Sequence, residues 1–574
     1  MAVALAAALP AAASPPSSAV DSYTVALDTV PRADLFDAPV YYELNRARFI
    51  QDGDLELLRS GKVRVQHYAP VDVSDFAWRQ EAHAEYSWWM QMEELRFLLP
   101  LLSSRRGSDR ALAKQWLGRW YDFHVSAGLS PLLWGEPMTF AYRAMVFVYY
   151  LKTEEQRAEP DAEVVARLRE CIRTHQDHLV APEHFDRDNN HGMIDALGLL
   201  ETTRVIPNAS ARALAFERIA RMVAISVSDA GVELEHAAVY HFIFLRWLDE
   251  IVQYARALPG TPVDFIGRMT AVAGAMHAAA YFLQDHRGWI APIGDTDSVS
   301  VDAYSRDLRK ARAPNRARTL YDPRAGYAIY KGNKRRGDAR YLVFRLPQRI
   351  GMTAHAHGDA LALFLDYDGE VLLGDAGRYS YTPGEIRSYF KSPNAHNTVL
   401  LPAPQFMSAP SLPVAIDVHD LSSPDTTLWT AARALGPLQA TRVVRISAGR
   451  PEVVIDDILF DSSPDTATVQ SRITIQWHLG KDVRRVEETQ AGQNGVWEWK
   501  LTTRRGEHVR VQMEVRGDAA SLRPEMSVVC GEEQPMLGWY SPRQYVKRGV
   551  PLIRLTLGAR GGAHVETRIR TPRP

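Results

Sequence analysis

The sequence predicts an α+β protein: an N-terminal helical domain, an (α/α) toroid forming an incomplete barrel, followed by C-terminal antiparallel β-sandwich sheets. Two observations carry this prediction. Between residues 75 and 290 apolar side chains recur at helical spacing, and successive helix pairs of this kind suit a toroid. From about Tyr327 the period changes to two, in short segments separated by Gly, Asp and Pro turns, which is typical of antiparallel sheets.

The helical half is expected to contain six helical segments. The first runs from Asp75 to Leu102, and the second follows a cap at Ser108-Asp109. Asp161 is expected to cap the third, because apolar residues follow it at helical spacing from Val164. The remaining three are expected at about 208–228, 237–257 and 262–285.

The β half is expected to contain at least seven strands, and the change of period lies within residues 305–322. The predicted organisation is therefore a leader or disordered segment at 1–30, a helical toroid domain at 31–318 and an antiparallel β-sheet domain at 319–574. The expected strands are Tyr341–Leu346, Ala360–Tyr367, Val371–Gly374, Val443–Ile446, Val453–Phe460, Ile473–His478 and Val509–Val515.

Composition excludes several classes of protein. Among 574 residues, 67 Lys and Arg balance 68 Asp and Glu, so no global basic character indicates a nucleic-acid partner. Two cysteines, Cys171 and Cys530, cannot form a disulfide framework or a cysteine-rich zinc module. No segment offers 18 uninterrupted apolar residues, so no membrane span is expected.

The first residues, Met1 to Ser14, are rich in alanine and end in an Ala-x-Ala pattern, as a secretory signal does. No Lys or Arg precedes Arg32, however, so the positive region of a signal is missing. A signal would indicate a periplasmic or secreted protein, and a disordered leader a cytoplasmic one.

The densest group of chemically active residues surrounds His355, His357 and Asp359, with Asp375 and His396 downstream. On a strand, residues 355 and 357 would point to the same face. A His/Asp/His set can hold zinc, with water completing four-coordination. From the pattern alone, histidines satisfied in the core or in turns are the alternative.

Two further groups lie in the helical half. Asp188-Asn189-Asn190-His191-Gly192 stands at the start of an apolar helix, where a cap and turn is the ordinary interpretation. Glu235-His236 precedes Tyr240-His241, and Tyr240 shares a helical stripe with Phe244 and Trp247, which favours core packing.

Together these groups resemble the heparinase II/III-type polysaccharide lyases, whose motifs they match in order. The resemblance implies an (α/α) toroid followed by antiparallel sheets, and β-elimination next to a uronate carboxylate. The matching segments are Trp134–Arg143, Asn190-His191-Gly192, Glu235…Tyr240-His241, Ile293-Gly-Asp295, His355-x-His357-x-Asp359, Asp375-x-Gly377…Tyr381 and His396-Asn397-Thr398.

The resemblance assigns catalytic roles to four residues. Asn190 and His191 would neutralise the substrate carboxylate, so that charge on the adjacent carbon is stabilised. Tyr240 and His355 would remove the proton and protonate the leaving oxygen, in an order that is left open. A tyrosinate base would need a pKa below the usual value of about 10, which nearby imidazolium groups would supply.

The resemblance also implies a structural zinc ion held by His357, Asp375 and His396. Trp134 and Arg143 would line the substrate cleft, although a core indole and a buried salt bridge are equally compatible with their positions. Glu235, His241, Arg378 and Tyr379 complete the expected substrate-binding residues. This chain has His-Ala-His-Gly-Asp where the family often has His-Gly-His-Ala-Asp, and His-Ala-Ala after Glu235 where Gln-Ser-Pro is more usual.

The expected partner is an anionic polysaccharide, with heparin or heparan sulfate favoured and alginate or another glycosaminoglycan as alternatives. Basic groups at 105–106, 306–318 and 334–336 suit a sulfated chain. A uronate epimerase and a non-catalytic glycan-binding or exopolysaccharide-processing protein are the other functions. A glycoside hydrolase would need two paired carboxylates, and no motif supports Glu235 and Asp359 as such a pair.

Overall fold

The computed structural model describes residues 32–65, 68–74, 76, 78, 86–186, 191–311, 317–346, 355–401, 416–435, 437–447, 449–462, 472–517, 522–558 and 562–572. The predicted leader at 1–30 lies outside these residues. The chain forms two compact units, the first from Met1–Arg187, His191–Arg221 and Tyr254–Ile266, the second from Asp188–Asn190, Met222–Gln253 and Gly267–Pro574. No helix in the described ranges has the length and hydropathy to cross a membrane.

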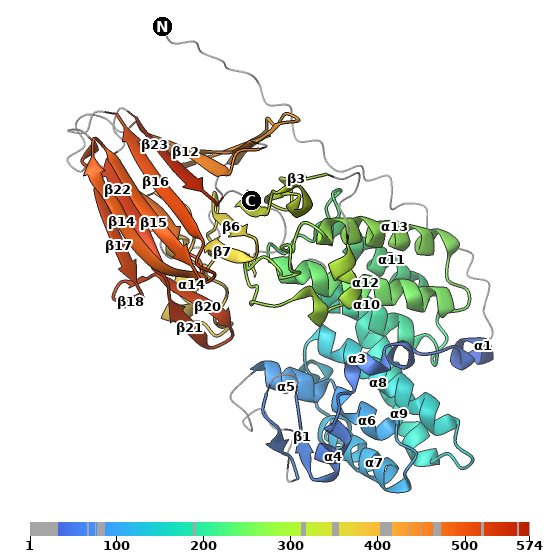
Figure 1. Ribbon diagram of the computed structural model, residues 1–574. Helices are drawn as coiled ribbons and strands as arrows, with labels where there is room; N and C mark the ends of the chain where they lie inside the picture. The colour runs from blue at the N-terminus through green and yellow to red at the C-terminus, as the bar shows by residue number, and fades with distance from the viewer. Residues whose placement is uncertain are drawn as a thin grey trace. The chain divides into compact units, whose positions relative to one another are not determined.

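Helices dominate the chain before residue 281, as predicted (Figure 1). Asp161 caps α9 by accepting hydrogen bonds from the amides of Glu163 and Val164 at 3.1 and 3.2 Å, which confirms the predicted cap. The helices are α1 (Arg32–Asp37), α2 (Tyr41–Leu44), α3 (Arg46–Phe49), α4 (Asp54–Arg59), α5 (Tyr86–Glu93), α6 (Leu99–Leu102), α7 (Gly107–Tyr121), α8 (Pro137–Glu155), α9 (Ala162–Val180), α10 (His191–Thr202), α11 (Ala209–Ser226), α12 (Ala238–Ala257) and α13 (Val263–Ala280).

Two predicted helix details are wrong. The segment ending at Leu102 is not one helix, because Leu95 adopts a left-handed conformation with φ of 56° and separates α5 from the turns before α6. Helix α7 begins at Gly107, so Asp109 lies inside its first turn. The Asp109 carboxylate accepts hydrogen bonds from Arg59 at 2.7 and 2.9 Å instead of capping its own helix.

The second unit contains three large antiparallel sheets. A five-stranded sheet has the order β3-β4-β5-β6-β7, a four-stranded sheet β17-β22-β13-β8 and an eight-stranded sheet β14-β15-β16-β23-β12-β11-β10-β9. The strands are β3 (Thr319–Asp322), β4 (Tyr327–Lys331), β5 (Arg340–Arg345), β6 (Leu363–Tyr367), β7 (Glu370–Leu373), β8 (Val399–Leu400), β9 (Ile416–Asp420), β10 (Thr426–Leu435), β11 (Leu438–Ser447), β12 (Glu452–Asp461), β13 (Arg472–His478), β14 (Val483–Gln493), β15 (Val496–Thr503), β16 (His508–Arg516), β17 (Glu525–Cys530), β22 (Pro551–Gly558) and β23 (Ala563–Arg570).

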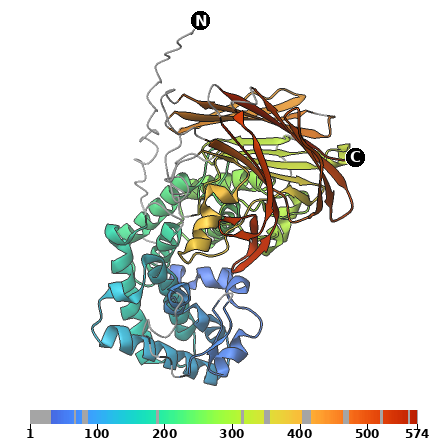
Figure 2. The same ribbon diagram turned by 90° about the vertical axis from the view of Figure 1, so that its left-hand side faces the viewer.

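One hydrophobic core joins these sheets. It includes Phe344 of the five-stranded sheet, Trp477 of the four-stranded sheet and Trp499 of the eight-stranded sheet, all at most 1 % exposed. Figure 2 shows the five-stranded sheet in yellow-green beside the broad sheet in orange and red. Each of the seven predicted strands overlaps an observed one, because the period of two reflects side chains that alternate between this core and the opposite face.

Candidate active site and metal centre

Three segments of the second unit bring together Tyr240, Asp295, His355 and His357. Tyr240 lies in the first turn of α12, Asp295 follows α13, and the two histidines precede β6. Residues 355–357 are not in a strand, so the alternation that would place both side chains on one face of a strand does not apply. The two side chains nevertheless meet the same partner, because both contact the Asp295 carboxylate.

Tyr240 and His355 are stacked. Their ring centroids lie 3.9 Å apart with an angle of 21° between the planes. The Tyr240 hydroxyl lies 3.1 Å from the hydroxyl of Tyr381, and His355 Nε2 lies 3.7 Å from a carboxylate oxygen of Glu235. A phenol and an imidazole thus stand side by side, which is an arrangement suited to moving two protons at one face of a substrate.

Asp295 determines which nitrogen of each histidine carries hydrogen. Its Oδ2 lies 3.0 Å from His355 Nδ1, and its Oδ1 lies 2.9 Å from His357 Nε2. A carboxylate only accepts hydrogen bonds, so each facing nitrogen donates. In their neutral forms, His355 therefore keeps its lone pair on Nε2 and His357 on Nδ1.

Arg387 of helix α14 (Glu385–Lys391) completes the surroundings of Asp295. Its guanidinium donates to both carboxylate oxygens, at 2.5 and 2.8 Å. Burial alone would raise the pKa of Asp295, but hydrogen bonds from His355, His357 and Arg387 outweigh it and hold that pKa well below its usual range. Asp295 is thus a fixed anion that orients His355, a role typical of the third member of a catalytic triad.

The Tyr240 phenol does not have the lowered pKa that a tyrosinate base would need. Burial raises its pKa well above the ordinary value, and Tyr381, Glu235 and Asp295 add to the shift. These surroundings, burial above all, disfavour a tyrosinate. Tyr240 is therefore a protonated phenol at neutral pH.

The residues around Tyr381 shape the edge of the site. Arg378 makes a two-point ion pair with Asp297, at 2.8 and 2.9 Å, and its guanidinium carbon lies 4.7 Å from the centroid of the Tyr381 ring. Tyr379 adopts a left-handed conformation with φ of 58° and stacks on Phe390. These contacts of Arg378 with Asp297 and Tyr381 therefore orient the loop that carries Tyr381.

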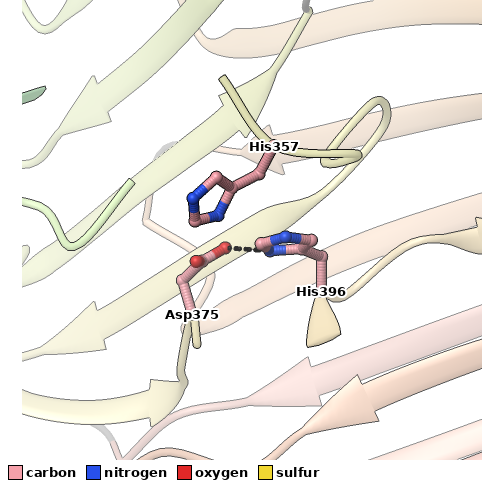
Figure 3. Close-up of side chains that lie close together, drawn as sticks. All are labelled: His357, Asp375 and His396. Atoms are coloured by element: carbon pink, nitrogen blue, oxygen red, sulfur yellow. Dashed lines mark hydrogen bonds and ion pairs between the residues drawn. The ribbon is translucent and has the colours of Figure 1, made fainter. Parts of the chain in front are cut away.

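Three side chains beneath this site form a group able to hold a metal ion (Figure 3). One ligand atom each from His357, Asp375 and His396 lies within 4.8 Å of the others, and all three residues are buried. His396 Nδ1 lies 3.0 Å from Asp375 Oδ2. Three buried atoms, His357 Nδ1, Asp375 Oδ1 and His396 Nε2, have no hydrogen-bond partner among the described residues. Such atoms are costly unless a cation binds them, so the set fits zinc.

Gly294 allows the Asp295 loop to approach His355. It has φ of 60°, and a Cβ there would lie 2.5 Å from the carbonyl oxygen of His236 and 2.9 Å from that of His355. We expect Gly294→Ala to cost about 1–3 kcal/mol and to lower activity, because strain would move the His355 backbone. Thermal unfolding measures the first effect and turnover the second.

Gly267→Ala is the matched control for this substitution. Gly267 lies in α13 with open space around its α-carbon, so alanine should stabilise the helix by about 0.5–1 kcal/mol. An equal melting temperature for Gly294→Ala and the wild type would contradict the close approach described above.

Other residues expected at the site have structural contacts. Trp134 is 3 % exposed and stacks on Phe140, while fully buried Arg143 donates to the carbonyl oxygens of Glu93 and Trp134 at 2.6 and 2.9 Å. These positions favour the core alternative for Trp134 and Arg143. His241 is buried, lies 3.1 Å from the carbonyl oxygen of Met276 and has a pKa lowered to about 3 by burial, which favours a core role.

The remaining expected residues are Glu235, Asn190 and His191. Glu235 is 5 % exposed and faces His355, as given above. Asn190 lies outside the described residues. His191 begins α10, and its Nδ1 lies 3.7 Å from Asp186 within the first unit.

The segment that contains His355 and the group His357, Asp375 and His396 matches a known protein family. Residues 321–548 match the family described as heparinase II/III-like, C-terminal. This segment is a heparinase II/III-like domain. No curated protein sequence matches the chain.

Solved structures resemble the whole chain as well as this domain. Heparinase III matches at 14 % identity and a TM-score of 0.72, covering 91 % of this chain and 85 % of its own. Heparan sulfate lyase HepC from Pedobacter heparinus matches at 13 % and 0.64, covering 92 % and 84 %. A chondroitinase AC lyase matches at 10 % and 0.53, covering 95 % and 83 %. At identities this low, the structural similarity establishes a shared fold alone, and it confirms the predicted fold class.

The heparinase II/III-like domain also explains the exchanged small residues in His-Ala-His-Gly-Asp. A Cβ on Gly358 would lie 2.7 Å from Pro393, and the Gly358 amide donates to the Lys391 carbonyl oxygen at 2.8 Å. A side chain at residue 358 would therefore require the segment before His396 to shift.

The sequence analysis did not name Asp295, Tyr381 or Arg387 as site residues. Asp295 and Tyr381 stand in motifs that matched the family, so their signal was present. Arg387 has no sequence signal, because its role depends on helix α14 placing it against a residue 92 positions away.

Proposed function

We propose that the protein is a polysaccharide lyase that cleaves uronic acid-containing polysaccharides by β-elimination. The observation that carries this proposal is the stack of Tyr240 on His355, with His355 oriented by Asp295, at a heparinase II/III-like domain. The stack supplies one group that accepts a proton and one that donates a proton, which is what elimination requires.

His355 acts as the base in this proposal. Its Nε2 lone pair takes the proton next to the uronate carboxylate, and the electrons of that bond form the new double bond. The bond to the leaving glycosidic oxygen breaks, and the Tyr240 hydroxyl protonates that oxygen. Asn190 and His191 neutralise the substrate carboxylate, a role that rests on their match to the family motif.

The metal group has a structural role in this scheme. His357, Asp375 and His396 would hold zinc, which supplies a fixed positive charge that organises the loop before β6. His355 lies two residues from His357 in that loop. The metal is thus expected to position the base without contacting the substrate.

The side-by-side arrangement favours elimination over epimerisation. An epimerase needs its acid and base on opposite faces of the sugar ring, whereas Tyr240 and His355 stand 3.9 Å apart in one stack. Groups on one side suit a uronate whose proton and leaving oxygen share a face, as in glucuronate. This geometry does not separate the glucuronate-containing glycosaminoglycans. The preference for heparan sulfate-like chains rests on the similarity to heparinase III and to heparan sulfate lyase HepC, with other glycosaminoglycans and alginate as alternatives.

Ultraviolet absorbance tests the activity directly, because elimination leaves a conjugated unsaturated uronate and hydrolysis does not. The substrates are heparin, heparan sulfate, unsulfated heparosan, hyaluronan, chondroitin and alginate. A rise in absorbance with one of them supports the proposal and names the polymer. Folded, metal-loaded protein that gives no rise on any of them would favour a glycan-binding or epimerase function, and solvent proton exchange into the sugar would identify the latter.

The pH profile separates the two possible roles of Tyr240. A general acid must be protonated, and the raised pKa keeps the phenol protonated throughout the neutral range. We expect kcat/KM to show no loss from Tyr240 ionisation below about pH 10, the usual phenol pKa. If Tyr240 were the base, kcat/KM would instead rise about tenfold per pH unit toward alkaline pH.

A further inference from the structure

A strongly basic groove lies in the second unit, separate from the residues of the candidate active site. Its cavity volume is about 1010 Å³. Among the residues that the structure describes, seven Lys and Arg line it against a single carboxylate, that of Asp285. The basic residues are Arg287, Arg309, Arg318, Lys331, Lys334, Arg335 and Arg336.

The fold holds this groove rigidly. Lys331, at the end of β4, is buried and donates to the carbonyl oxygens of Tyr281 and Gln284 at 2.7 and 2.8 Å, which fixes the floor. The next turn, Lys334–Arg336, is a 3₁₀ helix capped by Asn333, whose side chain accepts from the Arg335 amide at 3.1 Å. Three consecutive cations are thus presented on an ordered turn.

Part of this charge is not neutralised by the protein. Arg309 pairs with Asp302 and Lys334 with Asp368. Among the described residues, no carboxylate forms an ion pair with Arg318, Arg335 or Arg336. Arg335 and Arg336 are exposed and Arg318 is half-buried. Uncompensated cations along a groove favour a polyanionic ligand.

The lining favours a sulfated glycan over a nucleic acid. Single-stranded nucleic acids need aromatic platforms on which bases stack, and duplex DNA needs an element that enters a groove. Tyr281 is the one Phe, Tyr or Trp among the lining residues that the structure describes, and Lys331 Nζ lies 4.0 Å from the centroid of its ring. Sulfate and carboxylate groups on a sugar chain need only the cations.

We propose that this groove is a second, non-catalytic binding site for a sulfated polysaccharide chain. The choice of ligand rests on the proposed function, because the candidate active site would act on the same class of polymer. A chain bound at both sites dissociates more slowly than one bound at the active site alone. We therefore expect affinity to rise with the length and the sulfation of the chain.

Equilibrium binding of a heparin dodecasaccharide tests the proposal. Tyr240→Phe serves as the background, so that the probe is not cleaved. Arg318→Gln, Arg335→Gln and Arg336→Gln are combined and compared with Arg484→Gln, Arg510→Gln and Arg548→Gln, which remove the same charge from exposed positions outside the groove. Melting temperatures verify that both triple variants are folded.

We expect the groove variant to bind the probe roughly 3- to 100-fold more weakly, since each exposed ion pair contributes modestly. The control variant should bind like its parent. Equal affinities in all proteins, or an equal loss in the control, would overturn the proposal, as would a DNA oligonucleotide that binds the groove as tightly as heparin. Binding is measured without turnover, so the groove and the lyase activity are tested separately. If heparin affinity depends on these arginines but the wild-type protein cleaves none of the polymers, the lyase proposal is refuted and the groove is not.

Discussion

Tyr240→Phe is expected to lower kcat/KM by about 10²–10⁴-fold while substrate affinity changes little. The substitution removes only the hydroxyl oxygen, so the ring keeps its stack on His355. Without the hydroxyl, the leaving oxygen departs unprotonated, and general acid catalysis contributes a factor of this size. Initial rates from the absorbance assay, together with binding of an oligosaccharide, measure the two quantities.

Two tyrosines provide controls for this prediction. Tyr381→Phe removes the hydroxyl that faces Tyr240 at 3.1 Å and should cost only a hydrogen bond, about 0.5–1.5 kcal/mol of transition-state stabilisation. Tyr367, the last residue of β6, donates its hydroxyl hydrogen bond to the carbonyl oxygen of Pro572. Tyr367→Phe removes that hydroxyl and should leave activity unchanged. A Tyr240→Phe variant with near wild-type kcat/KM would require another residue as the acid.

Removing the metal is the second change expected to have a large effect. The purified protein should contain about one zinc ion per chain, and chelation should lower the melting temperature. A ligand present at a thousand times its Kd stabilises the folded state by about 4.1 kcal/mol, so the loss is of that order. Elemental analysis and thermal unfolding before and after chelation measure both quantities, and added zinc should restore the melting temperature.

His396→Ala should abolish metal binding, because His396 would supply the Nε2 ligand atom from a fully buried position. His419→Ala removes an exposed histidine from the same unit and should leave metal content and melting temperature unchanged. Metal-free protein whose melting temperature does not respond to zinc would show that the three residues are only a hydrogen-bonded cluster.

Sequence patterns predicted the fold well where the physical signal is local. The helical period located α9, α11 and α12 to within a few residues, and the period of two located β5, β6 and β13. Both periods arise from burial of one face of an element, which a short window of sequence records. The break at Leu95 was not predictable in this way, since a left-handed leucine depends on surrounding packing.

The site was predictable in its residue types and less so in its electrostatics. The group His357, Asp375 and His396 was named from motifs, and the structure places its members together. The direction of the Tyr240 pKa shift was not predictable, because burial and neighbouring carboxylates are properties of the folded chain. Arg387 was missed for the same reason, as its partner is distant in sequence.

The Asp295 carboxylate has a consequence for which mutations this protein tolerates. Asparagine has nearly the same shape, but its side chain offers one acceptor and one donor group where the two histidines need two acceptors. One ring would have to exchange its tautomer. Either His355 would turn a hydrogen toward the substrate, or His357 would turn one toward the metal group. Replacing one side-chain oxygen of residue 295 by nitrogen would thus impair either turnover or metal binding, whereas the native carboxylate is compatible with both.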